Sequence, residues 1–460
     1  MSSLWESIAR PDQPVAGIFH AHTLSVALSE LTAASILEGK LESLRGRNVL
    51  LATHDQLPTA IALAELDGVA RRLVLCTPDL ARETLMAVAA TAQADAVVVD
   101  DIPADPLSGI AQIATATRPM PEKFQRRNSE ATEWILLTSG TTGMPKLVAH
   151  SFASLAGALP RHSTSGRPMV WSTFYDIRRY GGLQIYLRAA LSGSPLVLSS
   201  AGETAHDFLA RAGAHKVTHI SGTPSHWRRA LMSGDTGLID PEYVRLSGEV
   251  ADQTVLDKLR AAYPHARVAH AFASTEAGVA FDVNDGLAGF PADLIGNPNA
   301  PIQMKVQDGT LWIRSQRIAA RYLGDAPAAL VADDGYVDTG DMVELEAGRY
   351  HFRGRKGGII NVGGLKVYPE EVESVLNADP RVRMSLVKAR RNPITGAIIV
   401  AEVVLSEGQN AADAEATERV KTDLLNACRR TLAAHKVPAL LRFVPGLELT
   451  AAGKLVRPGA

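Results

Sequence analysis

Short apolar runs and amphipathic segments alternate along the first 270 residues of the chain. Apolar runs suited to buried strands cover residues 48–52, 72–76, 96–100, 195–199, 217–220 and 267–272. Segments with helical spacing of apolar residues lie among them and cover residues 57–68, 79–92, 206–214 and 252–263. Strands that alternate with helices are typical of βαβ units, in which helices cover a mostly parallel sheet. This pattern predicts an α/β fold.

The pattern changes after about residue 300. Short alternating runs such as 310–314 and 349–352, broken by Gly and Asp, predict antiparallel strands that form a small barrel-like part. After the basic, glycine-rich stretch 353–358, strands and helices are expected at residues 359–362, 369–377, 384–389, 397–405 and 412–435. We therefore predict a large domain over residues 1–356 and a small α+β domain over 357–460, which Gly357 and Gly358 could hinge.

Composition narrows the class of protein. A chain of 460 residues with 46% hydrophobic residues can fill two or three cores. Its net charge of −2, with acids and bases interspersed, gives no basic face for nucleic acid. Two cysteines, Cys76 and Cys428, are too few for a disulfide framework and indicate a reducing compartment. Without a signal-peptide pattern or an apolar run near the roughly 18 residues of a membrane span, we expect no membrane partner and a cytoplasmic protein.

A glycine- and threonine-rich loop follows the apolar run 134–137. Its candidate residues are Thr138, Ser139, Gly140, Thr141, Thr142, Gly143 and Lys146. Glycines let backbone N–H groups turn toward an anion, hydroxyls add donors, and the lysine adds a positive charge, so the loop suits a phosphate. The ordinary P-loop pattern is not met, because Pro145 precedes the lysine and Leu147 follows it. The alternative is a flexible surface loop.

Three further stretches carry candidate chemistry. Glu276, beside Thr275, could ligate Mg²⁺, or it could simply cap the start of a helix. Asp341 follows a glycine turn and could accept both hydroxyls of a ribose, or it could be an ordinary turn residue. Lys454 lies on a turn of small residues near the chain end, where a solvated lysine is common. Each motif alone is therefore ambiguous.

Together, the four stretches resemble the adenylate-forming superfamily: acyl- and aryl-CoA synthetases, adenylation domains of peptide synthetases, and firefly luciferase. Thr-Ser-Gly-Thr-Thr-Gly-x-Pro-Lys, Ser-Thr-Glu, Thr-Gly-Asp, Gly-Arg and Gly-Lys occur in the family's order, and the resemblance covers nearly the whole chain. It implies an enzyme that activates a carboxylic acid with MgATP and passes the acyl group to a thiol, most like an acyl- or aryl-CoA ligase that uses free coenzyme A. The alternatives are an enzyme that loads a separate carrier protein and a non-catalytic nucleotide-binding protein. A homodimer stays open.

The resemblance also implies a role for each matching residue. The loop from Thr138 to Lys146 would hold the β- and γ-phosphates of ATP, Thr275 the α-phosphate, and Glu276 the magnesium ion. Phe272 would stack on adenine, and Asp341 and Arg355 would hold the ribose. Lys454 would bridge the substrate carboxylate and the α-phosphate. The resemblance also implies that the small domain is mobile and rotates about a hinge at Lys356 and Gly357. After this rotation, a strand with Gly363, Gly364 and Lys366 would line the tunnel for the coenzyme A thiol.

The identity of the acid is less well defined by the sequence. By the same resemblance, the acyl pocket is expected to be lined by Phe174, Tyr175, Gly248 and Ala273. Two aromatic rings, and an alanine whose methyl group would shorten the pocket, favour a compact or flat acid over a long fatty chain. Arg178 and Arg179 could pair with a second carboxylate, although the sequence favours solvated side chains. Glu249 stands where the family usually has alanine, and the sequence gives it no role.

Overall fold

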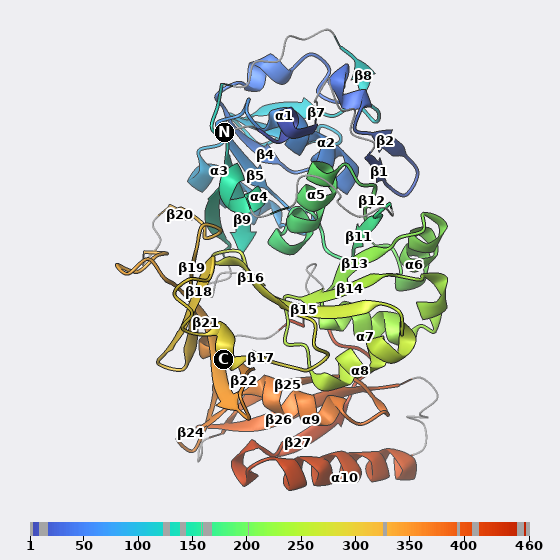
Figure 1. Ribbon diagram of the computed structural model, residues 1–460, viewed down its shortest axis with the longest axis vertical. Coiled ribbons are helices and arrows are strands. Elements are labelled where there is room, and N and C mark those ends of the chain that lie inside the picture. Colours follow the sequence, from blue (N-terminus) through green and yellow to red (C-terminus); the bar gives the residue numbers. More distant parts are fainter. Residues whose placement is uncertain are drawn as a thin grey trace.

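The computed structural model describes residues 3–8, 17–122, 129–138, 144–157, 159, 168–200, 202–324, 329–392, 396–406, 414–448 and 455–456. Four β-sheet regions follow one another through the molecule (Figure 1). The chain begins in the blue region at one end of the long axis, continues through the green and yellow regions, and closes with the orange and red region at the other end. The predicted α/β class is confirmed.

A seven-stranded sheet forms the first region, in the order β20-β10-β9-β5-β4-β6-β7. Its strands are β4 (Asn48–Leu51), β5 (Arg72–Leu75), β6 (Ala96–Val99), β7 (Ala111–Ala114), β9 (Glu133–Thr138), β10 (Lys146–Ser151) and β20 (Arg321–Leu323). The central strands are parallel, whereas β10 and β20 are antiparallel to their neighbours. Other elements of this region are α1 (Leu4–Ile8), α2 (Gln56–Leu66), α3 (Arg82–Ala92), α4 (Phe152–Ala156), and the paired strands β3 (Ala34–Ser35) and β8 (Met120–Pro121).

An eight-stranded sheet forms the second region, in the order β16-β15-β14-β13-β11-β12-β1-β2. Its strands are β1 (Ile18–His20), β2 (Ser25–Ala27), β11 (Trp171–Thr173), β12 (Leu196–Val197), β13 (His219–Gly222), β14 (Tyr243–Ser247), β15 (Arg267–Ser274) and β16 (Gly278–Val283). Its helices are α5 (Tyr180–Ser192), α6 (Ala205–Ala214), α7 (Pro224–Met232) and α8 (Gln253–Ala262).

Two separate cores lie on the two faces of this sheet. Leu183 and Leu187 of α5 share a core with Tyr243 and with residues of the first sheet. Val244 and Leu246 share the other core with α6, α7 and α8. Because neighbouring strand residues point to opposite faces, the alternation along β14 separates these two cores. Helix α5 therefore lies on the face of the second sheet that is turned toward the first.

The third and fourth regions match the change of pattern after residue 300. A five-stranded antiparallel sheet contains β17 (Phe290–Pro291), β18 (Ile302–Gln307), β19 (Thr310–Ser315), β21 (Val337–Glu346) and β22 (Arg349–Arg355). The C-terminal region contains β23 (Ile360–Val362), β24 (Leu365–Val367), α9 (Pro369–Asn377), β25 (Val382–Asn392), β26 (Gly396–Leu405), α10 (Ala414–Thr431) and β27 (Leu440–Phe443). Residues from 360 to 441 bury a core of their own. The domain boundary at 356/357 and the mobility of the small domain stay predictions.

Short 3₁₀ helices connect these elements at η1 (Glu30–Thr32), η2 (Leu41–Leu44), η3 (Asp235–Leu238), η4 (Ala292–Leu294), η5 (Lys356–Gly358) and η6 (Ala434–Lys436). The last strand of the five-stranded sheet runs directly into η5, which holds the predicted hinge residues Lys356 and Gly357. A Cβ atom added at Gly357 would meet nothing within 4 Å. Its surroundings therefore leave the backbone free of steric contact at this point.

Candidate active site

The glycine- and threonine-rich loop joins two antiparallel strands. Thr138 ends β9, Lys146 begins β10, and the two residues are register partners. The Thr138 hydroxyl is buried and has no hydrogen-bond partner among the described residues. Ser139, Gly140, Thr141, Thr142 and Gly143 lie outside the described residues. The hairpin therefore brings a lysine and an unpaired hydroxyl to the two ends of the loop.

Tyr322 connects this lysine with Glu276. The Lys146 Nζ lies 5.1 Å from the centroid of the Tyr322 ring. The Tyr322 hydroxyl donates to Glu276 Oε1 over a long 3.5 Å contact. Burial raises the pKa of Tyr322 to about 12, and the nearby carboxylate adds to this effect. Tyr322 is therefore a neutral donor between two charged groups, and the sequence analysis missed it.

A tight turn between β15 and β16 presents Glu276. The strand β15 ends at Ser274 and β16 begins at Gly278, and these two residues pair across the turn. The Ser274 hydroxyl accepts from the backbone N–H of Ala277 at 3.0 Å. No helix follows, so the helix-capping alternative for Glu276 is wrong: the chain reverses into an antiparallel strand.

His150 forms a hydrogen bond with the backbone of the same turn. It is 1% exposed, and its Nε2 donates to the backbone carbonyl of Thr275 at 2.7 Å. Its Nδ1 lies 3.0 Å from the Ser154 hydroxyl. Burial lowers the pKa of His150 to about 4, so the imidazole is neutral near pH 7. This second residue missed by the sequence analysis fixes the carbonyl that precedes Glu276.

Asp341 and Arg355 form the predicted pair on adjacent strands. They are register partners on β21 and β22. The Arg355 Nε lies 3.2 Å from Asp341 Oδ1, and its Nη2 donates to the Thr339 carbonyl at 2.7 Å. Gly340 takes a φ of 68° just before Asp341, a conformation that glycine adopts without strain. The structure therefore brings both predicted ribose ligands together.

Phe272 lies in a row of aromatic rings. Its ring stacks on Phe352 with centroids 5.2 Å apart and an interplanar angle of 10°, and it lies 6.0 Å from Phe281. The side chain is only partly buried. The row links β15 with β22, the strand that carries Arg355. Adenine stacking by Phe272 stays a prediction.

The four predicted residues of the acyl pocket pack in different parts of the second sheet, and the pocket that they would line stays a prediction. Phe174 packs with the core on the α6–α8 face and stacks on His226 with centroids 5.3 Å apart. Ala273 packs with the core on the α5 face. Tyr175 is buried, and its hydroxyl donates to the Ser247 carbonyl at 2.7 Å, directly before the exposed Gly248. The structure therefore groups Tyr175 with the end of β14 and separates Phe174 from Ala273.

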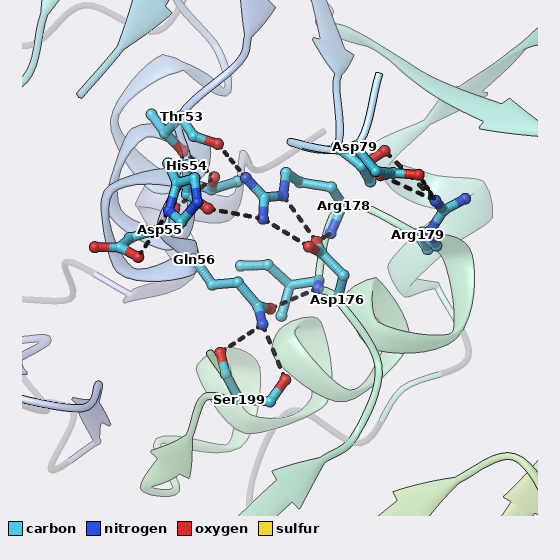
Figure 2. Close-up of polar contacts among 12 residues, drawn as sticks. Thr53, His54, Asp55, Gln56, Asp79, Asp176, Arg178, Arg179 and Ser199 are labelled. Atoms are coloured by element: carbon cyan, nitrogen blue, oxygen red, sulfur yellow. Dashed lines mark hydrogen bonds and ion pairs between the residues drawn. The ribbon is translucent and has the colours of Figure 1, made fainter. Parts of the chain in front are cut away.

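Arg178 and Arg179 are both engaged within the protein, so the expectation that they are solvated is wrong (Figure 2). Arg178 is 1% exposed and pairs with Asp176 at 2.6 Å. It also donates to the carbonyls of Thr53 and His54 in the loop between β4 and α2. Arg179 pairs with Asp79 at 3.1 Å. These contacts tie the segment before α5 to the first sheet.

Glu249 has two backbone partners. Its Oε2 accepts from the N–H of Ser225 at 2.9 Å, in the first turn of α7. Its Oε1 accepts from the N–H of Leu455 at 3.3 Å. Lys454 itself lies outside the described residues, but Leu455 is the next residue in the chain. Glu249 therefore connects α7 with the C-terminal segment.

The predicted residues of the thiol tunnel lie on a β-hairpin, with the two glycines in its turn and Lys366 on its second strand. Gly363 and Gly364 have φ angles of 57° and 85° and connect β23 with β24. Two successive residues with positive φ are typical of the tight turns that match strand twist, and they favour glycine. Lys366 follows on β24 and is exposed. The tunnel itself stays a prediction.

Residues 45–323 match the family model described as AMP-binding enzyme, and residues 371–454 match the model of its C-terminal domain. The chain belongs to the AMP-binding enzymes. It is 26% identical over 424 residues to the 2-succinylbenzoate–CoA ligase of Listeria innocua, covering 89% of this chain and 87% of the relative. It is 27% identical over 443 residues to the p-hydroxybenzoic acid–AMP ligase of Mycobacterium tuberculosis, covering 90% of this chain and 61% of the relative.

The fold is also that of a solved adenylate-forming enzyme. The crystal structure of an anthranilate CoA ligase in complex with anthranoyl-AMP matches with a TM-score of 0.80 and 17% identity, covering 99% of this chain and 95% of that one. As an AMP-binding enzyme, the chain is an ATP-dependent ligase, and it belongs to a family whose members use ATP, Mg²⁺ and, as a substrate, coenzyme A. Among the described residues, no helix is both long and apolar enough to cross a membrane.

Proposed function

We propose that this AMP-binding enzyme activates an aryl or short-to-medium acyl carboxylic acid and transfers the acyl group to coenzyme A. In the first half-reaction, a carboxylate oxygen attacks the α-phosphorus of ATP and displaces pyrophosphate, which gives the acyl-adenylate. In the second, the coenzyme A thiol attacks the acyl carbon, AMP leaves, and the thiol proton is released. The observation that carries this proposal is the grouping of Lys146 on β10, Tyr322 on β20 and Glu276 in the turn between β15 and β16, three separate parts of the chain.

The described residues of the site fit a bound MgATP. Among the described residues, no group of three or more His, Cys, Asp or Glu side chains could hold a metal ion alone. Magnesium typically takes one or two protein carboxylates together with phosphate oxygens, so Glu276 would be its protein ligand. When bound, the ion supplies positive charge that offsets the negative charge of the phosphates. The unpaired Thr138 hydroxyl is a donor that a phosphate oxygen would satisfy.

The other residues would orient the two reacting groups. Lys146 and Thr138 would bind the β- and γ-phosphates from the two ends of the loop, and Thr275 would donate to the α-phosphate. Asp341 would accept from the ribose hydroxyls, with Arg355 holding its carboxylate in place. Lys454 would bring the substrate carboxylate to the α-phosphate, because its charge attracts both anions.

In the proposed second half-reaction, the small domain turns about Lys356 and Gly357. Lys454 then leaves the site, and the hairpin with Gly363, Gly364 and Lys366 approaches it. Glycines at this turn would let the pantetheine arm pass close to the backbone, because they carry no side chain.

The test is pyrophosphate release from ATP across benzoates, cinnamates and aliphatic acids of short to medium length, each with and without coenzyme A. Turnover with one class of acid that requires coenzyme A would support the CoA ligase. A single burst of pyrophosphate, unaffected by coenzyme A but followed by turnover with a carrier protein, would replace this proposal with the alternative below. No pyrophosphate exchange with any acid would indicate a nucleotide-binding protein without catalysis.

The second candidate is an enzyme that stops at the acyl-adenylate or loads the pantetheine of a separate carrier protein. The similarity to a p-hydroxybenzoic acid–AMP ligase over 90% of this chain favours keeping it. The two candidates share the first half-reaction and differ only in the acceptor. Coenzyme A dependence of turnover therefore separates them.

A further inference from the structure

A cavity of about 200 Å³ lies between α5 and the second sheet. Its wall includes Trp171 at the start of β11, Arg188 on α5, Arg245 on β14, and Asp282 on β16. None of the residues predicted from the sequence as site residues lines it. The cavity lies on the α5 face, where Ala273 also packs.

Positive charge exceeds negative charge around this cavity. Three guanidinium groups line it, from Arg188, Arg245 and Arg267, against the single carboxylate of Asp282. That carboxylate pairs with Arg245 at 2.9 Å. Arg267 lies 4.7 Å from the centroid of the Tyr243 ring, close to the surface. The wall therefore carries a net positive charge, although Asp282 also attracts Arg188.

Arg188 is more enclosed than Arg267. Its guanidinium carbon lies 5.4 Å from the centroid of the Trp171 ring, and its side chain makes no hydrogen bond or ion pair with any described residue. Burial lowers its pKa, and the nearby Arg245 adds to this effect. A guanidinium has five N–H donors, and enclosed ones are normally paired. The Arg188 guanidinium therefore has N–H donors without an acceptor among the described residues.

The Trp171 indole offers a second unsatisfied donor in the same wall. Trp171 is 5% exposed, and its Nε1 is buried without a hydrogen-bond partner among the described residues. Buried indole N–H groups usually find an acceptor. An acceptor-only group, such as a carboxylate, would satisfy both Trp171 and Arg188.

The neighbouring strands relate this cavity to the proposed site of activation. Arg245 precedes Ser247 by two residues on the same face of β14, and Ser247 lies directly before Gly248 and Glu249. Val279, in the cavity wall, pairs with Ala273 two residues before Thr275. Two residues of a strand span about 7 Å. The part of the cavity wall at Arg245 and Val279 therefore lies close to Ser247 and Thr275, and an acid that extends from Thr275 past Arg245 would direct its far end toward Arg188.

We propose that this cavity binds a second carboxylate of the acid substrate, and that the enzyme prefers dicarboxylic acids to monocarboxylic acids of the same skeleton. This inference rests on the proposed function, because it assigns the substrate class of the same site. Arg178 and Arg179 already pair with the carboxylates of Asp176 and Asp79 (Figure 2), whereas Arg188 has no ion-pair partner among the described residues, so we assign the second carboxylate to Arg188. The Arg245–Asp282 pair holds the wall beside it.

The experiment compares matched pairs of acids: terephthalate with benzoate, and 2-succinylbenzoate with 4-oxo-4-phenylbutanoate. The readout is the ratio of kcat/KM values within each pair, measured by pyrophosphate release. A charge-assisted contact should raise this ratio by about 10- to 100-fold in at least one pair. Arg188→Met, which keeps length and removes charge, should lower the ratio by about the same factor, and Arg188→Lys should retain more of it.

Two further variants test the second donor and control for the loss of an arginine elsewhere. Trp171→Phe removes the N–H and keeps an aromatic ring, and it should lower the ratio by about 2- to 10-fold. Arg260→Met, on the exposed side of α8, makes the same chemical change outside the cavity and should leave the ratio as in the wild type. Circular dichroism of each variant checks that it folds.

Calorimetric binding of the dicarboxylic acids without ATP separates the two proposals. If no acid releases pyrophosphate but a dicarboxylate binds and Arg188→Met weakens its binding at least about 10-fold, the cavity stands and the proposed function fails. If acids turn over with equal kcat/KM within every pair, the proposed function stands and the cavity proposal is overturned. If Arg188→Met keeps the wild-type ratio, or if neither turnover nor binding occurs, the cavity proposal is also overturned.

Discussion

Removing the carboxylate of Glu249 should slow adenylation more than thioester formation. Its Oε1 accepts from the N–H of Leu455, the residue after the proposed catalytic Lys454. In Glu249→Ala this contact is lost, so the C-terminal segment should spend less time beside the site. The second half-reaction, in which Lys454 is proposed to have left, should be spared.

The geometry sets the size of the effect. A hydrogen bond to a charged group contributes about 1.5–3 kcal/mol, and charge-assisted bonds are usually shorter than 2.9 Å. Since the contact is 3.3 Å long and Glu249 is only partly buried, we take the lower end, about 1.5 kcal/mol. This corresponds to a roughly tenfold slower adenylation. Glu249→Gln keeps an acceptor and should lose less.

The assay measures both halves separately, by pyrophosphate exchange and by thioester formation from supplied acyl-adenylate. Because Glu249 also accepts from Ser225 N at the start of α7, a control must weaken that helix alone. Thr223→Ala removes the N-cap that accepts from His226 N at 3.0 Å and should cost about 1 kcal/mol of stability. Two outcomes would refute this reasoning. One is an equal loss of rate in both half-reactions of Glu249→Ala. The other is a Thr223→Ala variant whose ratio of pyrophosphate exchange to thioester formation falls as far as that of Glu249→Ala.

Three other predictions follow from the same site. Tyr322→Phe should slow pyrophosphate exchange about 2- to 5-fold, because only a weak 3.5 Å contact to Glu276 is lost; a larger loss would give the hydroxyl a direct role. Burial keeps the pKa of His150 at about 4, below the usual 6.5, so its neutral ring stabilises the fold above pH 6.5 and this stabilisation is lost toward pH 4. His150→Gln should therefore reduce the fall in the urea-unfolding free energy between pH 6.5 and 4 by up to about 3 kcal/mol, and an unchanged fall would contradict this. Gly278→Ala, at a φ of 78°, should lower the unfolding free energy by at least about 1–2 kcal/mol, whereas Gly357→Ala should be nearly neutral; equal effects would count against the argument.

The sequence predicted the elements well and their long-range contacts poorly. Apolar periodicity is a local property, so strands and helices such as β4 and α9 lie where the pattern placed them. The motifs around Glu276, Asp341 and Arg355 were also recognisable, because their residue order is characteristic. Their supporting contacts were not: Tyr322 reaches Glu276 across 46 positions, and Glu249 reaches Leu455 across 206. No local pattern marks such pairs.

Arg178 and Arg188 differ in whether the protein itself already satisfies their N–H donors. The sequence analysis named Arg178 as a possible partner of a second carboxylate. In the fold, its donors are taken by Asp176 and by the carbonyls of Thr53 and His54, so it has little left to offer a ligand. Arg188 lies ten positions later on α5, and the sequence analysis gave it no role.

The packing of α5 against the second sheet gives Arg188 an enclosed position. Helix α5 turns this side chain toward a cavity that also holds the unpaired Trp171 N–H and an excess of positive charge. Enclosing cations and donors without acceptors destabilises a fold, and such a cost is expected where a ligand supplies the missing group. Arg188 is therefore identified by its missing hydrogen-bond acceptors and not by a sequence motif, and we propose it as the residue that selects the acid.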